Sequence, residues 1–153
     1  MFQSYFLSRR SVPHKAAVLG FISAGNPADP DPFRRRQRLP IPAPFRRFGM
    51  FAFQVEGDSM TQPGGQGIVA GHFVLVDARD VMTDRGQVYA FQLADGSMVV
   101  KRLALWQGRP AMFSDNAAYA PVQLDRSVRN LGRVYAYSAD GRHWTPTRYR
   151  SWD

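Results

Sequence analysis

The sequence has no cysteine among its 153 residues. This absence excludes a disulfide framework and any zinc site built on thiolates. Long hydrophobic runs are also missing, because the longest uncharged apolar stretch, residues 16–24, is about half as long as a membrane span. The sequence therefore predicts a soluble or at most secreted protein with no membrane partner.

Patterns typical of bound metals and cofactors are lacking too. The three histidines, His14, His72 and His143, have no second histidine or acidic residue at metal-ligand spacing. The glycines at 64, 65 and 67 belong to no Walker or Rossmann pattern, since no helix signal follows them. We therefore expect neither a metal nor a cofactor.

Positive charge is concentrated in the first third of the chain. Residues 1–50 contain eight arginines and Lys15 against only Asp29 and Asp31, whereas residues 51–153 are nearly neutral. Seven of the eleven prolines lie in the same third, and proline at that density disfavours helices and central strands. The composition predicts an extended basic arm over residues 1–49 and a globular domain over residues 50–153.

The pattern of the expected domain is that of an all-β fold. Short runs rich in Val, Phe and Tyr alternate with turn residues, and no segment keeps a helical period. The Asp-Gly pairs at 95–96 and 140–141 suit two-residue hairpin turns, in which glycine tolerates positive φ. We expect a small twisted antiparallel sheet or barrel-like domain, with strands at 51–55, 72–77, 87–93, 98–103 and 131–137.

Lysine is rare in this chain, because only Lys15 and Lys101 of the twenty basic residues are lysine. If the run around Lys101 is a strand, it shares a face with Val99 and Leu103 while Arg102 points to the other side. Burial among apolar side chains lowers the pKa of an amine, so that lysine can act as a neutral base, which arginine cannot. The alternative is an edge-strand lysine whose amine reaches solvent.

Ser59 follows the first expected strand of the domain and a glycine, where backbone N–H groups can point at a substrate oxygen. Together with Lys101 it suggests a Ser-Lys dyad, in which lysine replaces histidine as the general base. The backbone amides of Ser59 and Met60 would then form the oxyanion site. Two alternatives remain: Ser59 is an ordinary turn serine, or it forms a triad with His72 and Asp77.

A series of short motifs follows the same stretch of chain: Val55-Glu56-Gly57-Asp58-Ser59-Met60, Gly67-Ile68-Val69-Ala70-Gly71, Val74-Leu75-Val76-Asp77, Val99-Val100-Lys101-Arg102-Leu103, Ser114-Asp115-Asn116 with Tyr119-Ala120-Pro121, and Leu131-Gly132-Arg133-Val134. In their order they resemble the LexA/UmuD-type self-cleaving serine peptidases, the S24 family. The resemblance covers residues 50–137. It implies that Ser59 is the nucleophile and Lys101 the general base, in an all-β catalytic domain that dimerises.

The arm carries a further resemblance at residues 22–27, Ile-Ser-Ala-Gly-Asn-Pro. This segment is similar to the family's cleavage segment and places the scissile bond between Ala24 and Gly25. The 49 residues before the domain are too few for a helix-turn-helix domain and a linker, so the chain resembles the UmuD branch. That resemblance implies a cytoplasmic homodimer, stimulated by a RecA–single-stranded DNA filament in the SOS DNA-damage response, whose processed form assists an error-prone translesion polymerase.

Some features depart from that family. His72 stands where an aspartate is usual, and the loop between Ser59 and Gly71 is longer. The arginine-rich run at 34–38 leaves open a protein that contacts nucleic-acid phosphates without base specificity, and a non-catalytic dimeric binding module is a further alternative. Residues 8–22 also imitate a twin-arginine export signal.

Overall fold

The computed structural model describes residues 11–23 and 37–150. Apart from one 3-10 turn, η1 at Ala43–Phe45, every regular element in these residues is a β-strand, which confirms the all-β prediction. The strands are β1 Lys15–Ser23, β2 Arg38–Pro40, β3 Met50–Glu56, β4 Thr61–Gln62, β5 Gln66–Gly67, β6 Phe73–Asp77, β7 Val88–Gln92, β8 Met98–Trp106, β9 Arg109–Phe113, β10 Val122–Gln123, β11 Arg129–Ser138 and β12 Thr145–Pro146.

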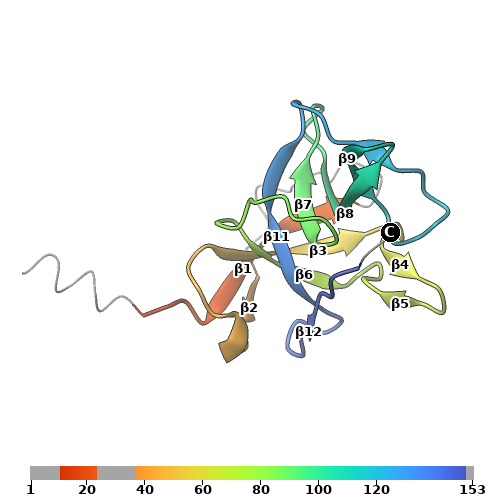
Figure 1. The fold of residues 1–153 in the computed structure, drawn as a ribbon. Coiled ribbons are helices and arrows are strands. Elements are labelled where there is room, and N and C mark those ends of the chain that lie inside the picture. The colour runs from red at the N-terminus through yellow and green to blue at the C-terminus, as the bar shows by residue number, and fades with distance from the viewer. Residues whose placement is uncertain (1–10, 24–36, 151–153) are drawn as a thin grey trace, which may run out of the picture.

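Strand pairing joins most of these elements into one large, mostly antiparallel sheet (Figure 1). The order along the sheet is β10-β9-β8-β7-β11-β6-β3-β1-β2, with β12 beside β11, while β4 and β5 form a separate hairpin. Strand β1 runs parallel to β3 and also meets β8, where Ser23 lies opposite Val99. This second pairing closes the circuit β8-β7-β11-β6-β3-β1 and gives the sheet a barrel-like form.

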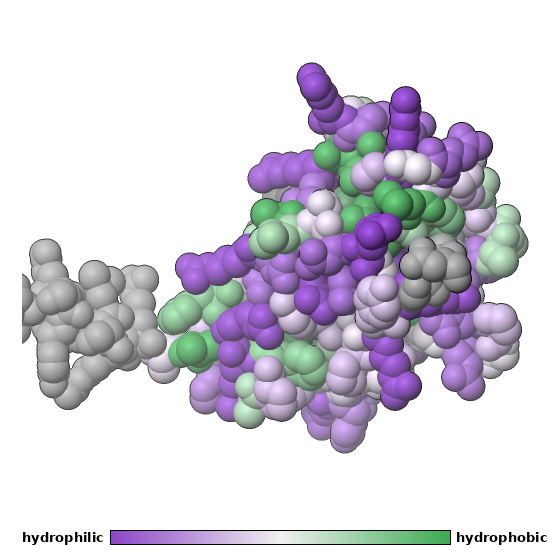
Figure 2. Space-filling model, viewed as in Figure 1, coloured by the Kyte–Doolittle hydropathy of each residue, from purple (hydrophilic) through white to green (hydrophobic). Residues whose placement is uncertain are grey.

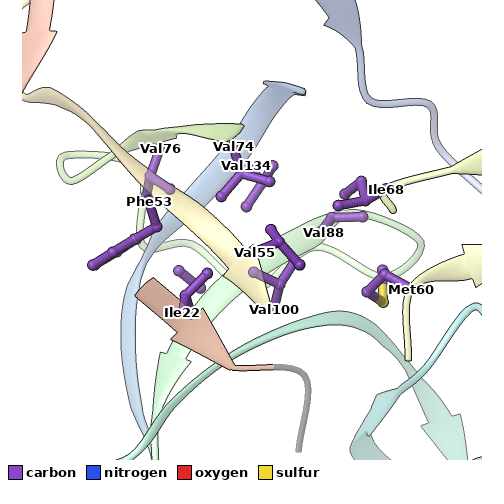
Figure 3. Packing of buried hydrophobic residues seen from close by; sticks show 11 residues of the cluster. Ile22, Phe53, Val55, Met60, Ile68, Val74, Val76, Val88, Val100 and Val134 are labelled. Atoms are coloured by element: carbon purple, nitrogen blue, oxygen red, sulfur yellow. The ribbon is translucent and has the colours of Figure 1, made fainter. Parts of the chain in front are cut away.

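Side chains from strands far apart in the sequence meet inside this circuit (Figure 3). Ile22 of β1 belongs to the same cluster as Val55 of β3 and Val100 of β8, and none of the three is more than 2% exposed. Burying one such side chain stabilises the fold by roughly 1.5–3 kcal/mol. Strand β1 precedes the boundary expected between residues 49 and 50, yet it pairs with β3, which follows that boundary.

The first Asp-Gly pair forms the predicted hairpin between β7 and β8, although its loop comprises residues 94–96 instead of two residues. The N–H of Leu93 lies 2.8 Å from the carbonyl oxygen of Ser97 and closes the loop. Gly96 alone adopts a left-handed conformation there, with φ 87°, which is typical of a three-residue hairpin loop.

The second Asp-Gly pair does not form a two-residue hairpin turn, and this prediction is wrong. Residues 139–144 join β11 to β12 as a wider loop. The Asp140 carboxylate accepts the backbone N–H groups of Arg142 and His143, each at 2.8 Å. These two bonds stabilise the wider loop because they satisfy backbone groups that a tight turn would have paired across the strands.

Hydrophilic side chains cover most of the face shown in Figure 2, and apolar ones gather over β7–β9 and beside β1 and β2. The exposed apolar side chains include Leu105 and Trp106 at the end of β8 and Val122 on the edge strand β10. None of the described helical segments has the length and apolar character that a membrane crossing requires.

Candidate active site

Ser59 lies in the turn that follows β3. Gly57 adopts a left-handed conformation, with φ 78°, and lets the chain turn sharply directly after the strand. The turn is fixed on both sides, because the N–H of Thr61 donates to the carbonyl of Asp58 at 3.0 Å and the N–H of Asn116 donates to that of Ser59 at 2.8 Å. These bonds fix the main chain around Ser59, which is fully buried.

Lys101 lies in the middle of β8, and its neighbours follow the predicted alternation. Val99 and Leu103 pack in one apolar cluster, whereas Val100 packs in another on the opposite face. Lys101 itself is only 8% exposed. Burial lowers the pKa of its amine to about 8, because the charged form loses hydration. The edge-strand alternative, in which the amine reaches solvent, is therefore wrong.

The structure brings these two side chains together although they are 42 residues apart in the sequence. The Nζ atom of Lys101 lies 3.2 Å from the Oγ atom of Ser59, within hydrogen-bond distance. When the amine is neutral, its lone pair can accept the proton of the Ser59 hydroxyl, which turns that oxygen into a nucleophile. The pair is thus able to act as nucleophile and general base.

The alternative triad of Ser59, His72 and Asp77 does not form. His72 precedes β6 and Asp77 ends it, so about five residues of extended strand, roughly 16 Å, separate them. The Nδ1 atom of His72 accepts the N–H of Val69 at 3.1 Å, and the Asp77 carboxylate accepts that of Arg79 at 2.9 Å. Burial also lowers the pKa of His72. His72 therefore has a local structural role in its loop.

Ser114 is a site residue that the sequence did not single out. Its Oγ atom lies 2.7 Å from Nζ of Lys101, closer than that of Ser59, and the residue is only 6% exposed. The ring of Tyr119 lies 5.6 Å from the same Nζ atom, and its hydroxyl donates to the Asp58 carboxylate. The motif that contains Ser114 was visible in the sequence, but only the β8–β9 pairing reveals that it reaches Lys101.

The predicted oxyanion and cleavage sites differ in how much of them the structure describes. The described residues contain no group of three or more His, Cys, Asp or Glu that could hold a metal ion. Among their backbone hydrogen bonds, none uses the N–H groups of Ser59 or Met60, which the sequence predicts as the oxyanion site. Ala24 and Gly25, the predicted cleavage site, lie outside the described residues, whose first segment ends at Ser23.

Comparison with known proteins agrees with this geometry. The family model described as Peptidase S24-like matches residues 17–135. The chain is 37% identical to LexA repressor 2 of Pseudomonas putida over 108 residues. This match covers 70% of this chain and 50% of that protein. The chain is also 29% identical to the LexA repressor of Oenococcus oeni over 129 residues. That match covers 80% of this chain and 58% of that protein. The chain thus spans about half the length of the curated relatives it matches. Since the family model covers most of its residues, the chain belongs to the Peptidase S24-like family.

Proposed function

We propose that this protein is a serine peptidase that cleaves its own chain between Ala24 and Gly25. Ser59 is the nucleophile and Lys101 the general base. The observation that carries the proposal is the contact of 3.2 Å between the Ser59 hydroxyl and a buried lysine amine whose pKa is lowered to about 8. A lysine of ordinary pKa would remain almost fully protonated at neutral pH and could not accept the serine proton.

The reaction begins when the Ser59 oxygen attacks the carbonyl carbon of Ala24 and passes its proton to Lys101. The N–H groups of Ser59 and Met60 stabilise the negative oxygen of the tetrahedral intermediate. Lys101 then donates its proton to the amide nitrogen of Gly25, the bond breaks, and residues 1–24 remain as an ester on Ser59. A water molecule, deprotonated by Lys101, hydrolyses this ester and regenerates the serine.

The path of β1 supports delivery of the cleavage segment to this pair. Ser23 lies opposite Glu56, which is three residues before Ser59, and opposite Val99, which is two residues before Lys101. Because β1 and β8 are parallel, extension of the substrate by two residues in the same direction would bring it level with Lys101. Tethering also keeps the local substrate concentration roughly millimolar, so that a slow catalyst suffices.

The rate of self-cleavage should rise with pH, because Lys101 must lose its proton before it can act as a base. The fraction of neutral amine increases roughly tenfold between pH 7 and pH 9 for a pKa of about 8, and it changes little above that range. First-order rates of disappearance of the intact chain, measured from pH 6 to pH 10, should follow this curve. A rate that is independent of pH, or that falls as pH rises, would contradict the assignment of Lys101 as base.

The biological setting is a further part of the proposal. We infer that cleavage takes place in the SOS DNA-damage response, that a RecA–single-stranded DNA filament stimulates it, and that the processed form is an accessory subunit of an error-prone translesion polymerase. The similarity to LexA repressors supports this setting. The lysine also supports it, because an amine that is mostly protonated at neutral pH favours slow cleavage until a partner stimulates it.

Homodimerisation belongs to the same proposal. The sheet has an open edge at β10, close to exposed apolar side chains, and such edges pair readily with another chain. Light scattering at micromolar concentration should therefore give twice the mass of one chain. A strictly monomeric mass would count against a dimer.

A further inference from the structure

Two consecutive residues of β8 contact two consecutive residues that follow β9. In the register of these strands Arg102 lies opposite Phe113, so Ser114 and Asp115 come directly after the pairing. Lys101 contacts Ser114 on one side of the strand, with 2.7 Å between Nζ and Oγ. Arg102 contacts Asp115 on the other side, so that the strand is held to this segment from both faces.

The contact between Arg102 and Asp115 holds Ser114 in place beside Lys101. Arg102 binds the Asp115 carboxylate through two parallel hydrogen bonds of 2.8 Å each, and both side chains are at most 5% exposed. Such a two-pronged pair has a strongly preferred geometry. On its other side the segment is tied to the Ser59 turn by the bond from the Asn116 N–H to the Ser59 carbonyl, at 2.8 Å. Ser114 is therefore placed with little freedom relative to both members of the dyad.

A neutral amine has two N–H donors and one lone pair, and only the lone pair can take a proton from Ser59. The amine rotates about its terminal carbon bond, so that without a second contact the lone pair faces Ser59 only part of the time. An oxygen that accepts one N–H at a fixed position restricts this rotation. The Ser114 hydroxyl oxygen lies at hydrogen-bond distance for this role.

We propose that Ser114 is a positioning residue that accepts an N–H of Lys101 and so directs the lysine lone pair at the Ser59 hydroxyl. This inference rests on the proposed self-peptidase function and adds a third side chain to it. Ser114 is not the nucleophile in this account, because its contribution passes through Lys101.

The same hydrogen bond favours the charged form of Lys101, since an ammonium donates a stronger bond than a neutral amine. Its removal should lower the pKa of Lys101 further below the value of about 8 that burial sets. The neighbouring elements also carry titratable groups: Tyr89 lies opposite Lys101 on β7, Asp58 and Tyr119 lie in the flanking loops, and Asp115 is paired with Arg102. None of these is altered when Ser114 is replaced.

The two lysines of the chain allow a direct test, because selective ¹³C labelling of lysine gives only the signals of Lys15 and Lys101. The titration of Lys101 is followed in Ser59→Ala, which should keep the chain intact, and in Ser59→Ala/Ser114→Ala. We expect the midpoint to fall by about one pH unit when the Ser114 hydroxyl is removed. An unchanged or higher midpoint would overturn the inference, and this readout does not depend on any cleavage.

Cleavage kinetics supply the second arm of the test. Ser114→Ala should cleave about tenfold more slowly than wild type at pH 9. The difference in rate should be smaller at pH 7, because at that pH the Lys101 amine is neutral more often in the variant than in wild type. Ser114→Thr keeps a hydroxyl and should recover most of the rate. Ser138→Ala removes another buried serine, one whose hydroxyl instead accepts the N–H of Gly141, and should cleave like wild type.

The outcomes separate the inference from the proposed function. If wild type cleaves but Ser114→Ala matches it at both pH values, or if Ser114→Thr is as slow as Ser114→Ala, the positioning role is wrong and the dyad stands. If wild type does not cleave at any pH, the proposed function fails, and the lysine titration still decides whether Ser114 binds the amine.

Discussion

Replacing Lys101 by methionine should abolish self-cleavage while the protein remains folded. Methionine has a similar length and fills the same apolar surroundings, but it has no lone pair that can accept the Ser59 proton. Loss of a general base lowers a rate by about 100-fold to 10,000-fold. Cleavage followed by gel electrophoresis or mass spectrometry at about pH 9 should therefore show only intact chain over a period in which wild type is consumed.

A second substitution distinguishes the base from a simple positive charge. Lys101→Arg keeps the charge, but guanidinium stays protonated at every accessible pH, so this variant should be equally inactive. Lys15→Met removes the other lysine, which is exposed on β1, and should cleave at the wild-type rate. Retained cleavage in both Lys101 variants would remove lysine from the mechanism.

Replacing Arg102 by methionine should cause the largest loss of stability in the site region. The substitution leaves the Asp115 carboxylate buried without its cation, and the carbonyls of Gly86 and Arg148 lose the N–H that Arg102 donates to them. Breaking a buried ion pair from one side costs about 3–5 kcal/mol of unfolding free energy. Urea unfolding of the variant, measured in the Ser59→Ala background so that the chain stays intact, should show this loss.

Arg47→Met is the matched control for that experiment. Arg47 also pairs with a buried carboxylate, that of Asp77, but at 3.4 Å and with an arginine side chain that is 40% exposed. Its loss should cost no more than about 1 kcal/mol, because solvent weakens the pair. Equal losses for the two variants would mean that burial of the Arg102 pair does not matter.

Much of the fold follows from local patterns in the sequence. The strands at residues 51–55 and 98–103 were predicted because these short runs are rich in apolar side chains and lie between turn residues, and both are present as β3 and β8. The Lys101 face was also predictable, since alternation along a strand fixes which neighbours share a side. The rarity of lysine in an arginine-rich chain was the signal that singled out Lys101 from twenty basic residues.

Strand β1 could not be predicted in the same way. It lies in a stretch whose prolines and arginines indicated an extended arm, and its partners are the distant strands β3 and β8. Pairing between parallel strands that are far apart in the sequence leaves no local signature, because it depends on the closure of the whole sheet. The burial of Ile22 in the core appears only when that closure is known.

The roles of Ser114 and Gly132 could not be predicted from the sequence for related reasons. The approach of Ser114 to Lys101 depends on the register of β8 and β9. A shift of that register by one residue would turn the Ser114 side chain to the other face of the sheet. At Gly132 a Cβ atom would lie 2.2 Å from the carbonyl oxygen of Asp77, so only glycine fits at this crossing of β11 and β6. Close approach of two backbones cannot be read from the sequence of either segment alone.

We propose that Ser59 cleaves the chain between Ala24 and Gly25. The most direct test is an intact-mass measurement of wild type and Ser59→Ala after incubation at about pH 10, where Lys101 is neutral. Wild type should yield two fragments, residues 1–24 and residues 25–153, while Ser59→Ala should keep the full mass of 17.3 kDa. A C-terminal fragment that begins at any residue other than Gly25, or cleavage of Ser59→Ala, would show that Ser59 does not cut this bond.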